Sequence, residues 1–506
     1  MKMLNREADI IPKIVMGTFD PETRWRNPDL ARLPAMPDKD REAIVLCMDE
    51  LLFPFCGSED TLYSRCKIDP ALQEYLHGLG FAFRPRYSFD LNDNRESLPE
   101  PDAFKRCMFR LAAEQALITR PANRMLQAAS SAYSKGTILP ESTSPMNATG
   151  YSRQTHWPDE AVFAFSTKKL SPYAITADTE AYLHAAGPFA PLPGFETVVR
   201  VNSKMYSNQL LARIGEKCYG TEVNSAAEMV TAGNRLLMRG PYLLKDPFGV
   251  SGKGNLLIDS EAMQRRIATH LHKQEGNGLR SQFLLEPLLP KKTDFSSHWL
   301  IEESGKSEFI SVQRMLNHQQ NYSGSIKAED AFIGQLEKNG YFSVIENALR
   351  LLAEDGYHGF VCFDSMILED GEAVPIVEIN ARKSMGLINA YLDKSWEPYG
   401  LAGWLTFLSL GLPEGFTFGK LLHTLRKSGL LFTAPGEYGI IPLSSNTVMV
   451  NETLARRRAA DGAQNRRGMP KGRLYVSVLG RDDGHRSELI TSLRQVLADL
   501  SVKVYD

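Results

Sequence analysis

The stretch HGFVCFDSMILEDGEAVPIVEINARKSMG, residues 358–386, has the pattern of a β-hairpin. β-Branched and aromatic residues fill two runs, Gly359–Leu368 and Ala373–Asn380, and the turn-forming pair Asp370-Gly371 lies between them. The stretch therefore predicts two antiparallel strands joined by a tight connection.

Side-chain alternation along the second strand places Glu378 and Asn380 on one face, with Arg382 beside them if the chain stays extended. Asp364 reaches that face from the first strand only if the connection between the two strands contains an odd number of residues. We therefore predict a connection of three or five residues. Two carboxylates and an amide oxygen would then suit Mg²⁺. The alternative is a solvated sheet face that carries a salt bridge.

A second informative stretch, YLLKDPFGVSGKGN, covers residues 242–255, about 120 residues before the hairpin. It predicts a strand ending at Lys245, followed by a loop with three glycines and Lys253. Backbone N–H groups of glycines approach phosphate oxygens closely, and lysine adds positive charge. The pattern is not a P-loop, because a glycine follows Lys253. An ordinary hairpin remains the alternative.

The order of these stretches resembles that of the ATP-grasp superfamily, over residues 202–391. In sequence come Lys204, the Lys245 strand and glycine-rich loop, a strand ending in LLEPL that contains Glu286, then Asp294, Asp364 and the Glu378–Arg382 string. The resemblance implies a core of two α+β subdomains that clasp ATP, with Mg²⁺ as second cofactor.

Roles follow from the resemblance, residue by residue. The resemblance implies that the lysines and the loop contact phosphates. It also implies that Glu286, with backbone groups out to Leu288, forms the adenine hinge and that Asp294 contacts the ribose. The implied nucleotide-binding set is Lys204, Lys245, Gly249, Ser251, Gly252, Lys253, Gly254, Glu286, Leu288 and Asp294. The implied metal ligands are Asp364, Glu378 and Asn380, and Arg382 implies a contact with the transferred phosphoryl group.

One position departs from some members of the superfamily. They carry an arginine two residues before the aspartate, whereas this chain has Cys362 there. Arg382 or Arg314 would have to hold the acyl phosphate instead, so the implied catalytic residues are Arg382, Lys245 and Arg314.

The resemblance divides the chain into an ATP-grasp core at residues 201–400, an N-terminal α/β domain at 1–200 and a small C-terminal α/β domain at 401–506. The N-terminal part, with KIVMGTFD at residues 13–20, also resembles the pre-ATP-grasp domain of peptide ligases of natural-product biosynthesis. Pattern reading predicts strands at 11–17, 43–48 and 161–165, and helices at 103–130, 202–214, 341–353, 401–410 and 487–500.

The bulk composition narrows the function classes. A net charge of −2 does not favour a nucleic-acid partner, and six scattered cysteines form no zinc or disulfide pattern. The amino-terminal stretch has no signal-peptide core, and the apolar run at 401–412 is too short to cross a bilayer. We expect a cytoplasmic protein with no membrane partner, and a homodimer remains open.

The sequence thus predicts an ADP-forming carboxylate–amine ligase that makes a peptide-like amide from small-molecule acid and amine substrates through an acyl phosphate. A kinase, an acyl-to-thiol ligase and a non-catalytic nucleotide-binding protein remain alternatives. The polar run at 312–325 is either an acceptor-facing segment or a surface loop. The basic segment at 456–473 is a solvated loop, a closure over an anionic substrate or, third, a nucleic-acid contact.

Overall fold

The computed structural model describes residues 12–91, 169–179, 192–250, 253–318, 321–460 and 468–505. Three β-sheets organise these residues: a parallel sheet near the amino terminus, a small antiparallel sheet and a large antiparallel sheet. The elements expected at 103–130 and 161–165 lie outside the described residues.

The first sheet has the strand order β3-β2-β1-β4, and all its pairs are parallel. Its strands are β1 (Lys13–Met16), β2 (Thr61–Cys66), β3 (Arg84–Phe89) and β4 (Lys169–Pro172). The helices of this part are α1 (Pro21–Trp25), α2 (Lys39–Leu46), the 3-10 helix η1 (Met48–Phe55) and α3 (Pro70–Gly78).

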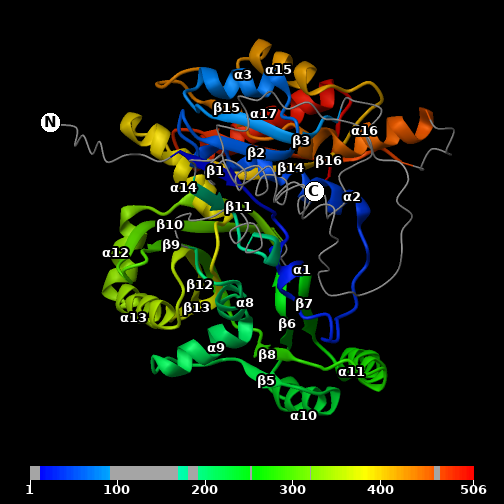
Figure 1. The fold of residues 1–506 in the computed structure, drawn as a ribbon, viewed down its shortest axis with the longest axis vertical. Helices are drawn as coiled ribbons and strands as arrows, with labels where there is room; N and C mark the ends of the chain where they lie inside the picture. The colour runs from blue at the N-terminus through cyan, green and yellow to red at the C-terminus, as the bar shows by residue number, and fades with distance from the viewer. Residues whose placement is uncertain are drawn as a thin grey trace, which may run out of the picture.

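The small sheet has the order β5-β8-β6-β7 and forms a separate lobe with two helices (Figure 1). Its elements are β5 (Thr221–Val223), α10 (Ala226–Leu237), β6 (Tyr242–Val250), β7 (Lys253–Ile258), α11 (Glu261–Gly276) and β8 (Phe283–Pro287). The apolar core of this lobe includes Ala31 and Leu33, so a segment from near the amino terminus completes it.

The large sheet has the order β13-β12-β9-β10-β11-β14-β16-β15, and β17 pairs with β14. Its first strands are β9 (Lys291–Ile301), β10 (Ser307–His318), β11 (Asn321–Lys327), β12 (Gly359–Leu368) and β13 (Ala373–Asn380). The helices of this region are α8 (Phe195–Val201), α9 (Lys204–Arg213), α12 (Asp330–Lys338), α13 (Tyr341–Glu354) and α14 (Met385–Trp396), with η2 (Glu397–Tyr399) after them.

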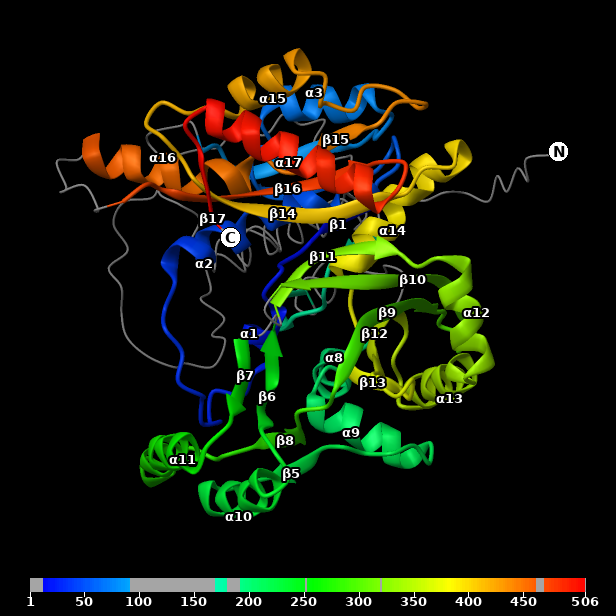
Figure 2. The same ribbon diagram turned by 180° about the vertical axis from the view of Figure 1, so that it is seen from behind.

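The carboxyl-terminal part extends the same large sheet, so the sheet continues across residue 400. Its elements are β14 (Gly403–Gly411), α15 (Phe418–Lys427), β15 (Gly439–Pro442), α16 (Asn446–Ala460), β16 (Lys471–Leu479), α17 (Asp483–Asp499) and β17 (Lys503–Tyr505). Figures 1 and 2 show these elements beside the amino-terminal sheet, at the end of the molecule opposite the small lobe.

Two secondary-structure predictions are wrong. Residues 43–48, expected as a strand, lie in α2 and the start of η1, because the Asp38 side chain caps the helix by accepting a hydrogen bond from the Arg41 backbone. Residues 401–410, expected as a helix, lie mostly in β14, which pairs with β11 on one side and β16 on the other. A short apolar run does not distinguish strand from helix, and here sheet pairing decided.

The hairpin prediction is confirmed. Asp364 pairs with Glu378, and the Leu368 backbone N–H donates to the Glu372 carbonyl, so three residues lie inside the closed connection. The helix predicted at 202–214 is α9, and the Ser203 side chain caps it by accepting a hydrogen bond from the Met205 backbone. The described residues of the run at 312–325 lie on the paired strands β10 and β11, not in a surface loop.

No helix among the described residues is long and apolar enough to cross a membrane.

Candidate nucleotide and metal site

The strand register brings the three expected metal ligands to one face of the large sheet. Asp364 of β12 pairs with Glu378 of β13, and Cys362 pairs with Asn380. Paired residues of antiparallel strands point to the same side, so Asp364, Glu378 and Asn380 share a face. The Asn380 amide donates a hydrogen bond of 2.9 Å to Asp364.

Burial of the pair has an electrostatic cost. Desolvation, followed by the charge of Glu378, raises the pKa of Asp364 to about 7. The Cys362 thiol lies 3.5 Å from Asp364 and supplies no compensating charge. A cation at this face would therefore be stabilised by Asp364 and Glu378.

The donor set fits Mg²⁺. Two carboxylates and an amide oxygen are hard ligands, and Mg²⁺ takes its remaining ligands from water and phosphate oxygens. Within the described part of the chain, no group of three or more His, Cys, Asp or Glu side chains could hold a metal ion. Besides the carboxylates of Asp364 and Glu378, a metal ion at this site would therefore need the Asn380 amide oxygen and ligands from outside the chain.

Lys204 connects this face to the glycine-rich stretch. It is the first residue of α9, and its side chain is 1% exposed. Its ammonium donates to Glu378 Oε1 at 2.8 Å and to the Gly249 carbonyl at 2.8 Å. An ammonium has three N–H donors, so a third one is left for a phosphate oxygen.

Lys245 ends the regular pairing of β6 with β7, and its ammonium forms an ion pair with Glu286 of β8. Beyond it the two strands approach closely: a Cβ on Gly254 would lie 2.6 Å from the Gly249 Cα, and Gly254 has a φ of +90°. Only glycine fits there without strain. Ser251 and Gly252 lie outside the described residues, as does the side chain of Lys253.

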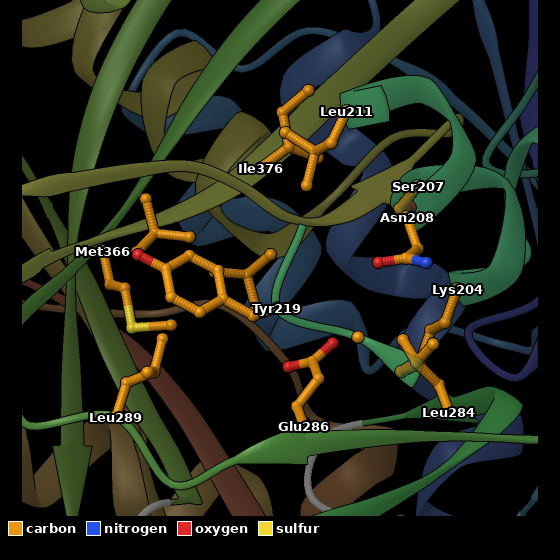
Figure 3. A pocket seen from close by; sticks show the side chains of 13 residues that line it. Lys204, Ser207, Asn208, Leu211, Tyr219, Leu284, Glu286, Leu289, Met366 and Ile376 are labelled. Atoms are coloured by element: carbon orange, nitrogen blue, oxygen red, sulfur yellow. The ribbon is translucent and has the colours of Figure 1, made fainter. Parts of the chain in front are cut away.

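A small cleft opens between α9, β8 and the β12–β13 hairpin (Figure 3). Lys204 and Glu286 line it together with apolar side chains from all three sides, and Tyr219 and Met366 lie near Leu289 in the close view. Met366, Val374 and Ile376 lie on the same sheet face as Asp364, so the cleft opens beside the carboxylates.

Two expected nucleotide contacts have different surroundings. Asp294 pairs in register with Met366, a cleft residue, and forms an ion pair with Lys291. The Leu288 side chain is 39% exposed and its backbone N–H donates to the Pro241 carbonyl, whereas the next residue, Leu289, lines the cleft.

The expected catalytic arginines are not brought together. β13 ends at Asn380, and two residues beyond it Arg382 donates to Glu22 at 2.7 and 2.9 Å, while its positive charge partly offsets the rise in the pKa of Asp364. Arg314 pairs in register with Phe295, on the face opposite Asp364, and forms an ion pair with Glu329 at 3.2 Å. The geometry therefore does not place Arg314 at the Asp364 face.

Several residues at this site carry no signal in the sequence. Glu22 and Tyr173 contact Arg382, and Arg26 forms an ion pair with Asp246 at the start of the glycine-rich stretch. These partners are separated by about 200 residues or more, so no local pattern could have indicated them.

Comparison with known proteins gives one relative in sequence and several in structure. No family model matches the chain. The [butirosin acyl-carrier protein]–L-glutamate ligase of Niallia circulans is 26% identical over 193 residues, which are 38% of this chain and 45% of that protein. The match thus spans less than half of the relative's length.

Solved structures with similar folds include an N5-carboxyaminoimidazole ribonucleotide synthetase in complex with ADP, 14% identical, with a TM-score of 0.43 over 68% of this chain and 84% of that one. An L-amino acid ligase from Bacillus licheniformis is 12% identical, with a TM-score of 0.41 over 68% of this chain and 82% of that one.

The small antiparallel lobe and the large sheet face each other across a cleft lined by Lys204, Glu286 and the side chains beside Asp364. This arrangement agrees with the two-subdomain ATP-grasp core that the sequence predicts.

Proposed function

We propose that this chain is an ADP-forming carboxylate–amine ligase. The observation that supports the proposal best is the meeting of Asp364, Glu378 and Asn380 with Lys204 beside an apolar cleft. Such a set positions a nucleoside triphosphate and neutralises its phosphates, which is most of what phosphoryl transfer requires of a protein.

The nucleotide would bind with its base in the cleft, between Leu289 and Met366 on one side and Leu284 on another. Lys204 and Lys245 would contact phosphate oxygens. Asp364, Glu378 and Asn380 would hold Mg²⁺, which supplies charge neutralisation at the phosphates when bound.

The reaction has two steps. A carboxylate oxygen of the acid attacks the γ-phosphorus of ATP, the bond to the bridging oxygen breaks, and ADP leaves. The amine nitrogen then attacks the acyl carbon of the acyl phosphate, a C–N bond forms, the C–O bond to phosphate breaks and the amine loses a proton. Exclusion of water by the protein would keep the acyl phosphate from hydrolysis.

A second candidate joins the acyl group to a thiol instead. The name of the Niallia circulans relative pairs an acyl-carrier protein with L-glutamate, and this favours an amino acid as the acid and a carrier protein as an acceptor. Both candidates share the first step and differ only in the nucleophile of the second.

The test is acid-dependent release of ADP by purified protein with ATP, Mg²⁺ and a panel of L-amino acids. Hydroxylamine should trap a hydroxamate with the active acid, and further arms add either an amine or pantetheine as acceptor. The Glu378→Gln variant, prepared in the same way, controls for contaminating ATPases. AMP and pyrophosphate as products, or no acid that increases ADP release, would contradict the proposal.

A further inference from the structure

The short helix α1 lies beside β6, between the amino-terminal sheet and the small lobe (Figures 1 and 2). Its flanking residues reach in both directions. The Trp25 indole donates to the Ile175 carbonyl at 2.8 Å, and residues 29–31 form backbone hydrogen bonds with Arg280 of the small lobe. These hydrogen bonds, which involve no charged side chain, join α1 and the residues after it to Ile175 on one side and to the small lobe on the other.

The first charged contact joins α1 to the end of β13. Glu22 Oε1 accepts two hydrogen bonds from Arg382, from Nε at 2.9 Å and from Nη2 at 2.7 Å. The Glu22 and Arg382 side chains are 6% and 10% exposed. Tyr173, whose ring stacks on Phe19 with centroids 4.0 Å apart, accepts from Arg382 Nη1 at 3.2 Å.

These contacts fix the orientation of the guanidinium. Arg382 Nη1 also donates to the Lys383 carbonyl at 3.1 Å, so four of the five N–H groups are used within the described residues. The fifth belongs to Nη2. Arg382 can therefore offer one directed N–H to a ligand, and Glu22 sets its direction. Glu22 Oε2 is buried and has no hydrogen-bond partner among the described residues.

The second charged contact joins the same helix to the glycine-rich stretch. Arg26, the residue that follows α1, forms an ion pair with Asp246 of β6, and the two side chains are 9% and 10% exposed. Asp246 also accepts the Phe248 backbone N–H at 3.0 Å. Arg26 thus holds the carboxylate that shapes the start of the loop.

We infer that α1 is a positioning element, in which Glu22 orients Arg382 and Arg26 fixes the glycine-rich stretch through Asp246. The role of Glu22 rests on the proposed function, because it concerns the reaction that Arg382 serves. The role of Arg26 at the glycine-rich stretch rests on the described contacts alone. Neither Glu22 nor Arg26 needs to touch substrate, because Glu22 acts through Arg382 and Arg26 acts through Asp246.

The Glu22 arm is tested by a double-mutant cycle with Arg382→Lys, using the amino acid that gives most hydroxamate. Glu22→Gln keeps the shape but weakens the charge-assisted contact, so kcat should fall about tenfold while KM for ATP stays within about twofold. In the Arg382→Lys background the same change should cost less than about twofold, because the effect of Glu22 passes through Arg382. Equal losses in the two backgrounds would overturn the inference.

The Arg26 arm needs no turnover. Arg26→Gln leaves Asp246 buried without its cation, so the affinity for Mg²⁺ and the β,γ-imido analogue of ATP, measured by calorimetry, should fall at least about tenfold. Arg26→Lys should restore part of it. An affinity equal to that of the wild type in a folded Arg26→Gln protein contradicts the role of α1 at the loop.

Arg24→Gln is the matched control, because Arg24 lies on the same helix but pairs with Asp178, at 2.7 Å, and not with a residue of β6 or β13. It should leave both readouts within about twofold, and melting curves report whether each variant is folded. A wild type that binds the analogue but makes no hydroxamate would refute the proposed function while the Arg26 arm still tests α1. A wild type that makes hydroxamate while Glu22→Gln behaves as Arg24→Gln would refute only the role of Glu22.

Discussion

Single residues at the carboxylate face serve more than one partner, and Glu378 is the clearest example. It pairs with Asp364 across the hairpin and accepts from Lys204 at 2.8 Å. The sequence indicated both carboxylates through strand alternation. It could not indicate that Lys204 would contact one of them, because that contact spans 174 residues.

Glu378→Gln should reduce the rate of ADP formation by at least about a hundredfold, comparable to the loss of one preorganised charge contact. The amide keeps the shape of the side chain but removes a charge that acts in the transition state, so turnover should fall more than ATP affinity. Steady-state kinetics with a parallel melting curve measures this. Near-normal turnover would remove Glu378 from the mechanism.

A buried histidine gives a residue-scale prediction about pH. His298 is 1% exposed, its Nε2 lies 3.0 Å from Ser384 Oγ, and burial lowers its pKa to about 3. A lowered pKa means that the unfolded chain binds the proton more tightly. Stability is therefore full above the ordinary value near 6.5 and is lost as pH falls from there toward 3.

The slope that one such histidine adds is about 1.4 kcal/mol per pH unit. The free energy of unfolding of His298→Gln, measured by urea titration at several pH values, should lack that slope between pH 6.5 and 4 relative to the wild type. Parallel curves for the two proteins would show that His298 does not titrate as described.

At the scale of elements, the glycine-rich hairpin depends on its neighbours for its shape. Gly249 and Gly254 approach too closely for a Cβ, and the Gly249 carbonyl accepts from Lys204 of α9. The sequence predicted a strand ending at Lys245 and a glycine-rich loop after it, because these signals are local. The contact with α9 depends on how the small lobe faces the large sheet.

The hairpin should gain protection from hydrogen exchange when the ATP analogue and Mg²⁺ are added, since its backbone N–H groups would then donate to phosphates. Lys245→Ala should weaken analogue binding and reduce this gain. The Glu286 carboxylate would also lose its ion pair, so calorimetry and exchange are measured on the same preparation. Unchanged binding and protection would place the phosphates elsewhere.

At the scale of the whole molecule, one apolar core runs through regions far apart in the sequence. It includes Val15 and Leu62 near the amino terminus, Ile345 of α13, and Leu405 and Leu474 from the carboxyl-terminal strands. β14 pairs with β11 of the central region, so the large sheet does not end at residue 400. The boundary predicted there has no structural counterpart in the sheet.

A fragment of residues 201–400 should therefore not fold alone. It would expose the edge of β11 and the apolar core residues that β14 and the amino-terminal part cover in the full chain. Exposed strand edges promote aggregation. Expression with circular dichroism and urea unfolding should show no cooperative transition, unlike the full chain. A soluble, cooperatively unfolding fragment would support the predicted boundaries.

The sequence by itself determined the local features: the hairpin at 359–380 with its odd-length connection, the capped helix α9, and the order of lysines and carboxylates that indicated an ATP-grasp fold. Alternation, capping and turn chemistry act over a few residues, so they can be read along the chain.

Only the tertiary structure decided the rest. Sheet pairing made residues 403–411 a strand, β-strand register turned Arg314 to the face opposite Asp364, and packing of α1 turned Arg382 toward Glu22. Each of these outcomes depends on a partner that is distant in sequence. The energy of such contacts comes from burial and pairing after the chain has folded, and it outweighs the weak local preferences of the residues involved.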